Sequence, residues 1–279
     1  MSIVDSHQHF WDLSKFDYPW MGDVDSVLKQ NHLPEMLKPQ MDEAGVDRTV
    51  IVQAVSSIDE AFWLLDLADV NEWIAGVVAW VDLQSPTVGD DLDALQKREK
   101  FCGIRHIWHD EPNDDWILGP AVLDGLRELA RRDIAYDLLV RPQHLKYVPP
   151  LLEAIPDLRT VVDHIAKPHI AEGLMEPWAT ELAIIASNPS VYCKFSGMVT
   201  EANHDNWTVG DLVPYAHRIV EMFGYERMMF GSDWPVSRLA SQYPRTFRSY
   251  VEALGDLPND AFANVFGGNA ECFYGLSES

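Results

Sequence analysis

Short apolar runs recur along this chain, and most of them are separated by stretches with the spacing of an amphipathic helix. Short runs bounded by polar residues are typical of buried strands, whereas apolar residues spaced near 3.6 indicate helices. The predicted strands are, in order, Ile3 to Asp5, Thr49 to Gln53, Ile74 to Val81, Cys102 to Trp108, Ile134 to Val140, Thr160 to His164, Val191 to Ser196 and Met228 to Phe230. The predicted helices include Asp59 to Val70, Asp90 to Lys100, Pro120 to Arg132, Leu145 to Ile155, Met175 to Ala186 and Leu212 to Phe223. Eight such units in 279 residues predict an α/β fold, a (β/α)8 TIM barrel.

A doubly wound open sheet is the rival fold for this alternating pattern. Its phosphate-binding signature, GxGxxG after the first strand, is missing here. No repeat or linker rich in Pro and Gly divides the sequence, so we expect residues 1–279 to form one barrel domain. The aromatic-rich segment 10–39 is long for a connection, and we expect it to fold over the mouth of the site. Residues 269–276 are predicted to end in a short packed helix.

Charge and composition restrict the partners and the compartment. A net charge of -23 argues against nucleic acid and anionic membranes, because few cations are available to neutralise phosphate. A small molecule is the expected partner, and the oligomeric state is left open. Cys102, Cys193 and Cys272 lack CxxC spacing and are predicted to be buried and reduced. No leader-like or membrane-spanning run is found, so we expect a cytoplasmic protein.

Three of the predicted strands end in side chains that can bind a metal ion or a substrate. His7 and His9 are separated by one residue, so in a strand they point the same way. His164 ends the sixth strand, and Asp233 follows the eighth. Active sites of TIM barrels lie at the carboxyl ends of the strands, and closure brings the eighth strand beside the first. We therefore expect these four side chains to converge.

Six motifs in this order resemble the amidohydrolase superfamily. They are His7-Gln8-His9-Phe10-Trp11, Gly103-Ile104-Arg105-His106, Arg141-Pro142-Gln143-His144-Leu145, Val162-Asp163-His164, Lys194-Phe195-Ser196-Gly197 and Phe230-Gly231-Ser232-Asp233-Trp234-Pro235. More narrowly, the chain is similar to the sugar-lactone hydrolases, including L-fuconolactonases and L-rhamnonolactonases. Pyrone-dicarboxylate and sulfomuconolactone lactonases are relatives of that branch. The resemblance covers nearly the whole chain.

The resemblance implies a barrel hydrolase in which Asp233 takes a proton from the attacking water. His7, His9 and His164 then surround the ester carbonyl in one of two ways. In the first, they bind one divalent metal ion together with Asp233, and Zn2+ is the expected metal. In the second, they donate hydrogen bonds to the carbonyl without a metal. Superfamily members with two metals often bridge them with a carboxylated lysine or a glutamate on strand four. The segment Cys102 to Trp108 contains neither, so a binuclear site is not expected.

Three further residues are candidates for binding substrate. Arg105 and His109 share a face if the fourth strand continues through both, and they can then bind substrate oxygens. The alternative for Arg105 is an ion pair with Asp110 or Glu111 at the rim. Trp11 can stack on the C–H face of a sugar, although large aromatics more often fill the core.

Two other groups are assigned structural roles. Arg141 and His144, which follow the fifth strand, are expected to hold their loop. Lys194 is expected to form a buried ion pair.

Three functions follow, from different classes. The leading hypothesis is hydrolysis of an aldonolactone, with a five-membered 1,4-lactone of L-fucose or L-rhamnose type as the expected substrate. The enzymatic alternative is a zinc-dependent decarboxylase of an aromatic or unsaturated acid, with His109 as a candidate acid or base. The third is a degenerate barrel that binds a sugar acid without turnover, which the substitution Asp233→Asn would distinguish from an enzyme.

Overall fold

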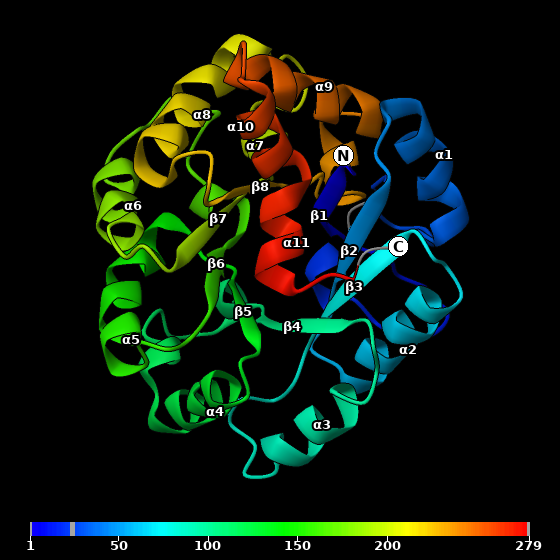
Figure 1. Ribbon diagram of the computed structural model, residues 1–279, viewed down its shortest axis with the longest axis vertical. Helices are drawn as coiled ribbons and strands as arrows, with labels where there is room; N and C mark the ends of the chain where they lie inside the picture. Colours follow the sequence, from blue (N-terminus) through cyan, green and yellow to red (C-terminus); the bar gives the residue numbers. More distant parts are fainter. Residues whose placement is uncertain (1, 23–25, 278–279) are drawn as a thin grey trace.

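The computed structural model describes residues 2–22 and 26–277, and its eight parallel strands lie inside a ring of helices (Figure 1). Each strand pairs with the next one along the chain, in the order β1 to β8. The strands are β1 (Val4–Gln8), β2 (Arg48–Val52), β3 (Ile74–Ala79), β4 (Phe101–His106), β5 (Ala135–Leu138), β6 (Thr160–Val162), β7 (Val191–Phe195) and β8 (Met228–Phe230). The predicted (β/α)8 barrel is confirmed, and each predicted strand overlaps one of these strands.

The α-helices lie between the strands and after the last one. They are α1 (Pro34–Ala44), α2 (Ile58–Asp69), α3 (Val88–Leu95), α4 (Pro120–Arg131), α5 (Val148–Ala154), α6 (Trp178–Ala186), α7 (Met198–Glu201), α8 (Val209–Phe223), α9 (Tyr243–Leu254), α10 (Asn259–Ala263) and α11 (Asn269–Tyr274). The six predicted helices correspond to α2, α3, α4, α5, α6 and α8. Within segment 10–39, the helix α1 already begins at Pro34, where proline fits the first turn. The connection after β1 is therefore shorter than expected.

Closure of the barrel depends on backbone bonds between β1 and the segment after β8. The amide of Asp233 donates to the His7 carbonyl at 2.8 Å, and the amide of His9 donates to the Trp234 carbonyl at 2.7 Å. The buried Asp5 carboxylate adds a third link, because it accepts from the Ser232 amide at 2.9 Å. These bonds place the end of β1 beside the chain that follows β8.

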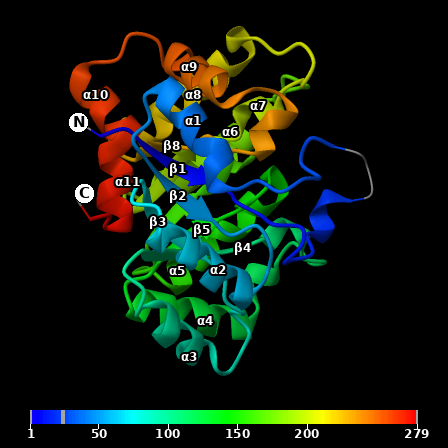
Figure 2. The same ribbon diagram turned by 90° about the vertical axis from the view of Figure 1, so that its right-hand side faces the viewer.

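The helix α11 closes the end of the barrel opposite the first long connection. Its side chains Ala270, Phe273 and Tyr274 are buried against inner residues of the strands, including Val4 and Val50. Figure 1 shows α11 crossing the middle of the strand ring, and Figure 2 shows it on the side away from the connection after β1. The predicted packed helix at 269–276 thus forms the base of the barrel.

Two sequence-based expectations concern cysteines and membranes. Cys193 is buried and Cys102 half-buried, but Cys272 is exposed, so the expectation that all three are buried is wrong. The reason is that α11 turns Phe273 and Tyr274 inward and Cys272 outward. All three cysteines are free. Within the described ranges, no helix has both the length and the apolar character needed to cross a bilayer.

Candidate active site

The candidate site is a cavity at the carboxyl ends of the strands, where this fold places its active sites. Its volume is about 230 Å³, which is small for a ligand site and suits a molecule with a single ring. The lining combines apolar, cationic, acidic and imidazole side chains: His9, Trp20, Ala54, Arg105, Ile107, His109, Asp110, Leu139, Arg141, His164, Lys167, Asp233 and Val236.

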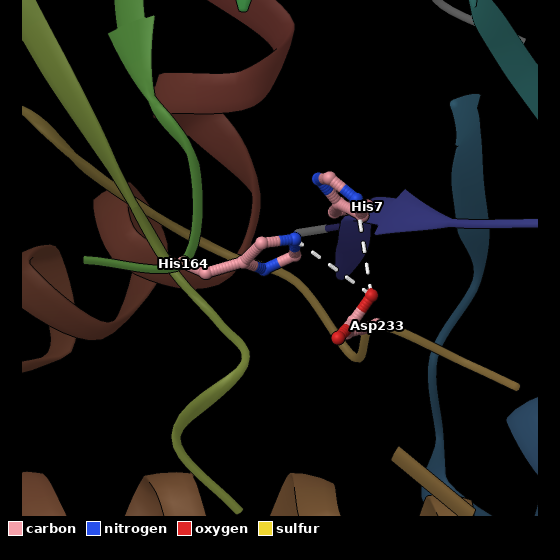
Figure 3. Close-up of side chains that lie close together, drawn as sticks. All are labelled: His7, His164 and Asp233. Carbon is pink, nitrogen blue, oxygen red and sulfur yellow. Dashed lines mark ion pairs between the residues drawn. The ribbon is translucent and has the colours of Figure 1, made fainter. Parts of the chain in front are cut away.

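Three imidazoles and one carboxylate meet at this cavity: His9, His164 and Asp233 line it, and His7 is buried directly behind them. The Oδ1 atom of Asp233 lies 3.4 Å from His9 Nε2, 3.8 Å from His164 Nε2 and 3.9 Å from His7 Nε2. Figure 3 shows His7 and His164 directed toward the Asp233 carboxylate. All four side chains are buried, and Asp233 Oδ2 has no hydrogen-bond partner among the described residues. The structure therefore brings together the four residues that the sequence singled out.

The close approach of β1 and the chain after β8 requires a glycine. A Cβ atom on Gly231 would lie only 2.7 Å from the Cβ of His7. Two residues later, Asp233 has a φ of 56°, in the left-handed region that aspartate adopts more readily than most residues. Local backbone geometry thus turns the Asp233 carboxylate toward His7.

His164 lies in a left-handed turn that follows β6. The φ angles of residues 164, 165, 166 and 167 are 52°, 47°, 63° and 50°. Left-handed conformation costs an L-residue roughly 1–2 kcal/mol, and a β-branched residue such as Ile165 is poorly suited to it. Strained backbone of this kind persists where the surroundings enforce it, and it gathers at functional sites. Here the turn carries both His164 and Lys167 to the wall of the cavity.

The segment that follows β7 contacts the His164 imidazole and holds it in position. The Oγ atom of Ser196 is 2.9 Å from His164 Nδ1, within hydrogen-bond distance. Gly197 allows the imidazole to pack directly on the backbone, since a Cβ there would lie 2.7 Å from His164 Cβ. The Ser196-Gly197 pair therefore fixes the ring that faces Asp233.

A buried network of alternating charges lies beneath the imidazoles. Lys194 Nζ donates to Asp137 Oδ2 at 2.5 Å and lies 3.2 Å from Asp163 Oδ1. The other Asp163 oxygen accepts from Arg105 Nη1 at 3.3 Å. The predicted buried ion pair of Lys194 is thus present. Burial raises the pKa of Asp137 to about 6, although the Lys194 ammonium opposes this rise.

The three imidazoles are neutral at neutral pH. Burial lowers the pKa of His7 well below its usual value, and the cations Lys194 and Arg105 act in the same direction. Burial also lowers the pKa of His164 well below its usual value and lowers that of His9. A neutral imidazole can donate from one nitrogen and accept at the other, so the position of its proton decides its chemistry.

Neighbouring groups determine where these protons lie. The Val52 carbonyl can only accept, so the His9 Nδ1–H donates to it at 2.7 Å and Nε2 keeps a free lone pair. Lys194 Nζ, 3.0 Å from His7 Nδ1, can only donate. When His7 Nδ1 accepts from Lys194, its Nε2 carries a proton directed at His9 Nε2, 3.2 Å away. When Nδ1 instead donates to Asp163 Oδ1, 3.4 Å away, His7 Nε2 has a lone pair that can accept from Arg105 Nη1 at 3.3 Å or bind a metal.

Three of these side chains, His7, His164 and Asp233, place ligand atoms within 4.8 Å of one another and could hold one metal ion, and His9 Nε2 lies beside His7 and Asp233. With metal–ligand bonds of about 2.0–2.1 Å, the ligand atoms of a tetrahedral site lie roughly 3.3 Å apart. The separation between the two Nε2 atoms of His7 and His9 is 3.2 Å, and those from Asp233 Oδ1 to the imidazoles are 3.4 to 3.9 Å. The outer nitrogens of His9 and His164 are held by Val52 and Ser196, as is usual for metal-binding histidines.

Two of the predicted substrate-binding residues line the cavity. Arg105 is buried and bonded to Asp163 and to the Gln53 carbonyl, rather than to the rim carboxylates considered as alternatives. The fourth strand ends at His106, and His109 lies in the 3-10 turn that follows. The shared strand face assumed for Arg105 and His109 is therefore wrong, yet the turn still brings His109 to the cavity wall.

The third predicted residue, Trp11, does not line the cavity. Its side chain has 0% exposure, and its indole N–H donates to the carbonyls of Leu28 and Gln30. The position of Trp11 therefore does not support the expected stacking on a sugar. The tryptophan that reaches the cavity is Trp20, nine residues further along the same connection.

Two cationic side chains of the cavity were not predicted to bind substrate. Arg141 follows β5 and lines the cavity, while its amide donates to His144 Nδ1 at 3.0 Å. The loop-holding role expected of this pair thus applies to His144, and Arg141 contributes to the wall. Lys167 also lines the cavity, and its Nζ donates to Glu201 at 3.0 Å. In the sequence, the feature that could have indicated Lys167 as a cavity residue is its position three residues after His164.

Comparisons with known proteins agree with this geometry. Residues 4–276 match the family model described as Amidohydrolase. An L-fucono-1,5-lactonase of Burkholderia ambifaria is 38% identical over 97% of this chain and 94% of its own length. An L-fucono-1,5-lactonase of Burkholderia multivorans is 34% identical over 99% of this chain and 96% of its own length. The crystal structure of an amidohydrolase from Burkholderia multivorans with bound zinc superposes with a TM-score of 0.92, at 34% identity, covering 99% of this chain and 100% of that one.

Proposed function

This chain belongs to the amidohydrolase family, and from that membership we propose that it is a lactonase, a hydrolase that opens the ring ester of a sugar acid. The resemblance seen in the sequence is thereby confirmed at the level of the family. One observation supports the activity above the others. Asp233 lines a cavity for one small ring and presents a buried carboxylate, one oxygen of which has no partner among the described residues, next to three neutral imidazoles.

The proposed reaction begins with Asp233 as the general base. Its carboxylate accepts a proton from a water molecule while the water oxygen attacks the lactone carbonyl carbon. Negative charge then develops on the carbonyl oxygen, and N–H donors already in place stabilise it. The guanidinium of Arg105, which lines the cavity, is one such donor, and the His7 Nε2–H is a second when His7 Nδ1 accepts from Lys194.

Collapse of the tetrahedral intermediate breaks the ring C–O bond. The protonated Asp233 returns its proton to the departing alkoxide, so the ring oxygen becomes a hydroxyl group and the carbonyl becomes a carboxylic acid. The acid loses its proton to solvent at neutral pH, which makes the reaction visible as proton release. An ester needs only one base and a polarised carbonyl, because its alkoxide leaves more readily than an amide nitrogen.

The four residues also support a proposal about metal. His7, His9, His164 and Asp233 would hold one divalent ion, with Zn2+ the first candidate because nitrogen-rich tetrahedral sites suit it. When bound, the ion would supply Lewis-acid polarisation of the carbonyl oxygen. Without it, the donors of His7 and Arg105 perform that task.

The identity of the lactone is the finer part of the proposal. The relatives of known activity are named for L-fucono-1,5-lactone, whereas the sequence led us to expect a five-membered 1,4-lactone. Both ring sizes place one ester carbonyl in a cavity of this volume. We therefore propose an aldonolactone of the L-fucono type and treat ring size as the variable to measure.

The proposed partner is this small molecule alone. The net charge of -23 supports the absence of nucleic-acid and anionic-membrane partners. Three free cysteines support a reducing compartment such as the cytoplasm.

A lactone panel tests the proposal. Purified protein is mixed with 1,5- and 1,4-lactones of L-fuconic, L-rhamnonic and D-gluconic acids, and acid release is followed with a pH indicator above spontaneous hydrolysis. We expect the L-fucono lactones to be hydrolysed fastest. Carbon dioxide release from aromatic acids is measured in parallel, because it would support the decarboxylase alternative.

Asp233→Asn is the matched variant, because it preserves shape while removing the base. We expect it to lower kcat by roughly 10²–10⁴-fold. Unchanged kcat in this variant, or no acceleration of any lactone by the native protein, would contradict the proposal. Retained binding of a sugar acid without any turnover in the native protein would instead support the degenerate barrel.

A further inference from the structure

Trp20 differs from the tryptophans that fill the core of this protein. The side chains of Trp11, Trp108, Trp178 and Trp234 are almost completely buried. Trp20 is 37% exposed, and it is part of the cavity wall. Large aromatic side chains are usually buried, so a solvent-exposed one beside a reactive site requires an explanation.

The Trp20 ring is held in place at its edge. Its indole N–H donates to the Ala54 carbonyl at 2.8 Å, across 34 positions of sequence. The ring of Trp11 packs against it edge-on, with centroids 5.4 Å apart and an interplanar angle of 78°. Trp11 is itself fixed by its hydrogen bond to the Gln30 carbonyl at 2.8 Å. Because its one polar group is already bonded, Trp20 offers a ligand only its aromatic surface.

The order of the strands places Trp20 and a group of polar lining side chains on different sides of the cavity. Trp20, Ala54 and Val236 follow β1, β2 and β8, which are neighbours around the barrel. Four polar side chains come from the connections after β4, β5 and β6, across the ring, where Ile107 and Leu139 also line the cavity. We define this polar wall as His109, Asp110, Arg141 and Lys167.

The polar wall contains both donors and acceptors. His109 Nε2 lies 3.5 Å from Asp110 Oδ1, and Lys167 is already paired with Glu201. Burial, with help from Lys167 and Arg141, lowers the pKa of His109 to about 3, so this imidazole is neutral. The His109 Nδ1 atom is buried without a partner among the described residues. Hydroxyl groups, which donate and accept, suit this mixture better than a carboxylate, which only accepts.

We propose that Trp20 is the binding face for the apolar side of the sugar ring and that the polar wall reads the hydroxyl groups on its other side. This inference rests on the proposed lactonase function and extends it to a residue that determines specificity. A saturated ring with C–H bonds on one face and hydroxyl groups at its edge fits between the two sides. Trp20 acts in binding, while Asp233 and the imidazoles act on the carbonyl.

Two substitutions separate stacking from loop anchoring. Trp20→Phe keeps an aromatic face but loses the N–H bond to Ala54, and Trp20→Leu loses both. For hydrolysis of L-fucono-lactone, we expect KM to rise less than about threefold in Trp20→Phe and roughly tenfold in Trp20→Leu, with kcat nearly unchanged. Trp116→Leu is the control. Trp116 is half-buried, donates its N–H to Gln84 at 2.7 Å and lies outside this cavity, so its loss should leave KM unchanged.

A binding measurement makes the test independent of turnover. In the Asp233→Asn background, calorimetry measures the affinity for the 1,5-lactam of L-fuconic acid, a ring amide of the same shape. We expect Trp20→Leu to weaken binding roughly tenfold and Trp20→Phe to retain it.

The outcomes distinguish the two proposals. Equal losses in the phenylalanine and leucine variants would assign Trp20 to loop anchoring and overturn the inference, as would no loss in either or no lactam binding at all. If no lactone is hydrolysed but lactam binding still depends on the aromatic ring, the lactonase proposal falls while the binding face stands.

Discussion

The indole N–H of Trp178 donates a 2.6 Å hydrogen bond to the carbonyl oxygen of Ile165. Trp178 begins α6, and Ile165 is the β-branched residue within the left-handed turn that carries His164. Both side chains are buried. A residue outside the cavity thus holds the backbone conformation on which the position of His164 depends.

Replacing Trp178 with phenylalanine tests this support. The Ile165 carbonyl would lose its buried donor, so we expect the free energy of unfolding to fall by about 1–3 kcal/mol. Because the turn would relax away from its strained conformation, we also expect kcat for lactone opening to fall roughly tenfold with little change in KM. Steady-state kinetics and urea unfolding measure the two effects.

Trp207→Phe is the control for that experiment. Trp207 is also buried and donates to a backbone carbonyl, that of Ala240, at 2.9 Å. We expect a similar loss of stability with kcat preserved. An equal loss of kcat in both variants would show that Trp178 has no special relation to His164.

The buried ion network predicts strong non-additivity between Lys194 and Asp137. Lys194→Met leaves the Asp137 and Asp163 carboxylates buried without the ammonium between them, and we expect a loss of about 3–5 kcal/mol in unfolding free energy. Adding Asp137→Asn removes one of the two charges and should recover part of this loss. Urea unfolding of the two single variants and the double variant gives the coupling. Purely additive losses would contradict the network.

Glu60 predicts a specific dependence of stability on pH. Its carboxylate accepts from the amides of Ala54 and Val55, yet burial raises its pKa from 4.5 to about 7. The folded protein therefore keeps this proton where the unfolded chain has lost it, so stability falls as pH rises from 4.5 to 7. This window corresponds to about 3 kcal/mol.

The variant Glu60→Gln measures that contribution. Between pH 4.5 and pH 8, we expect the unfolding free energy of the native protein to lose about 3 kcal/mol relative to this variant. Glu35→Gln, on the exposed surface of α1, serves as the comparison. Parallel pH profiles for the native protein and Glu60→Gln would refute the prediction.

The cluster of His7, His164 and Asp233, with His9 beside it, predicts uptake of one equivalent of zinc. We expect Ser196→Ala to weaken zinc binding by about 10–100-fold, since Ser196 orients His164 without being a ligand. Competition with a chromophoric chelator measures the affinity, and lactone hydrolysis after chelation shows separately whether activity needs the ion. Ser249→Ala, a buried serine of α9, is the control. Equal zinc affinity in both variants, or no saturable uptake, would contradict this prediction.

Periodicity located the strands because each β-strand of a barrel is a short buried run with polar ends. It also located Asp233, since the chain turns just beyond β8. Periodicity could not predict the conformation of His164. The left-handed turn there is enforced by Ser196, Gly197 and Trp178, which lie 14 to 33 residues away in the sequence. No local pattern encodes such support.

The substrate side of the cavity was harder to predict for the same reason. The fourth strand stops at His106, so a period of two could not be extended to His109. The choice between Trp11 and Trp20 depends on contacts across the connection and with Ala54, which sequence spacing does not show. Helix α1 was not predicted from the sequence, because Pro39 lies inside it and the flanking residues resemble a loop.

Helix α11 closes the barrel at the amino-terminal ends of the strands. The side chains of Ala270, Phe273 and Tyr274 fill the amino-terminal end of the barrel. Substrate and product therefore share one opening, the cavity beside Trp20 at the other end. An opened acid that has not yet left occupies the space that the next ring needs. We therefore expect the reaction product to inhibit the enzyme competitively.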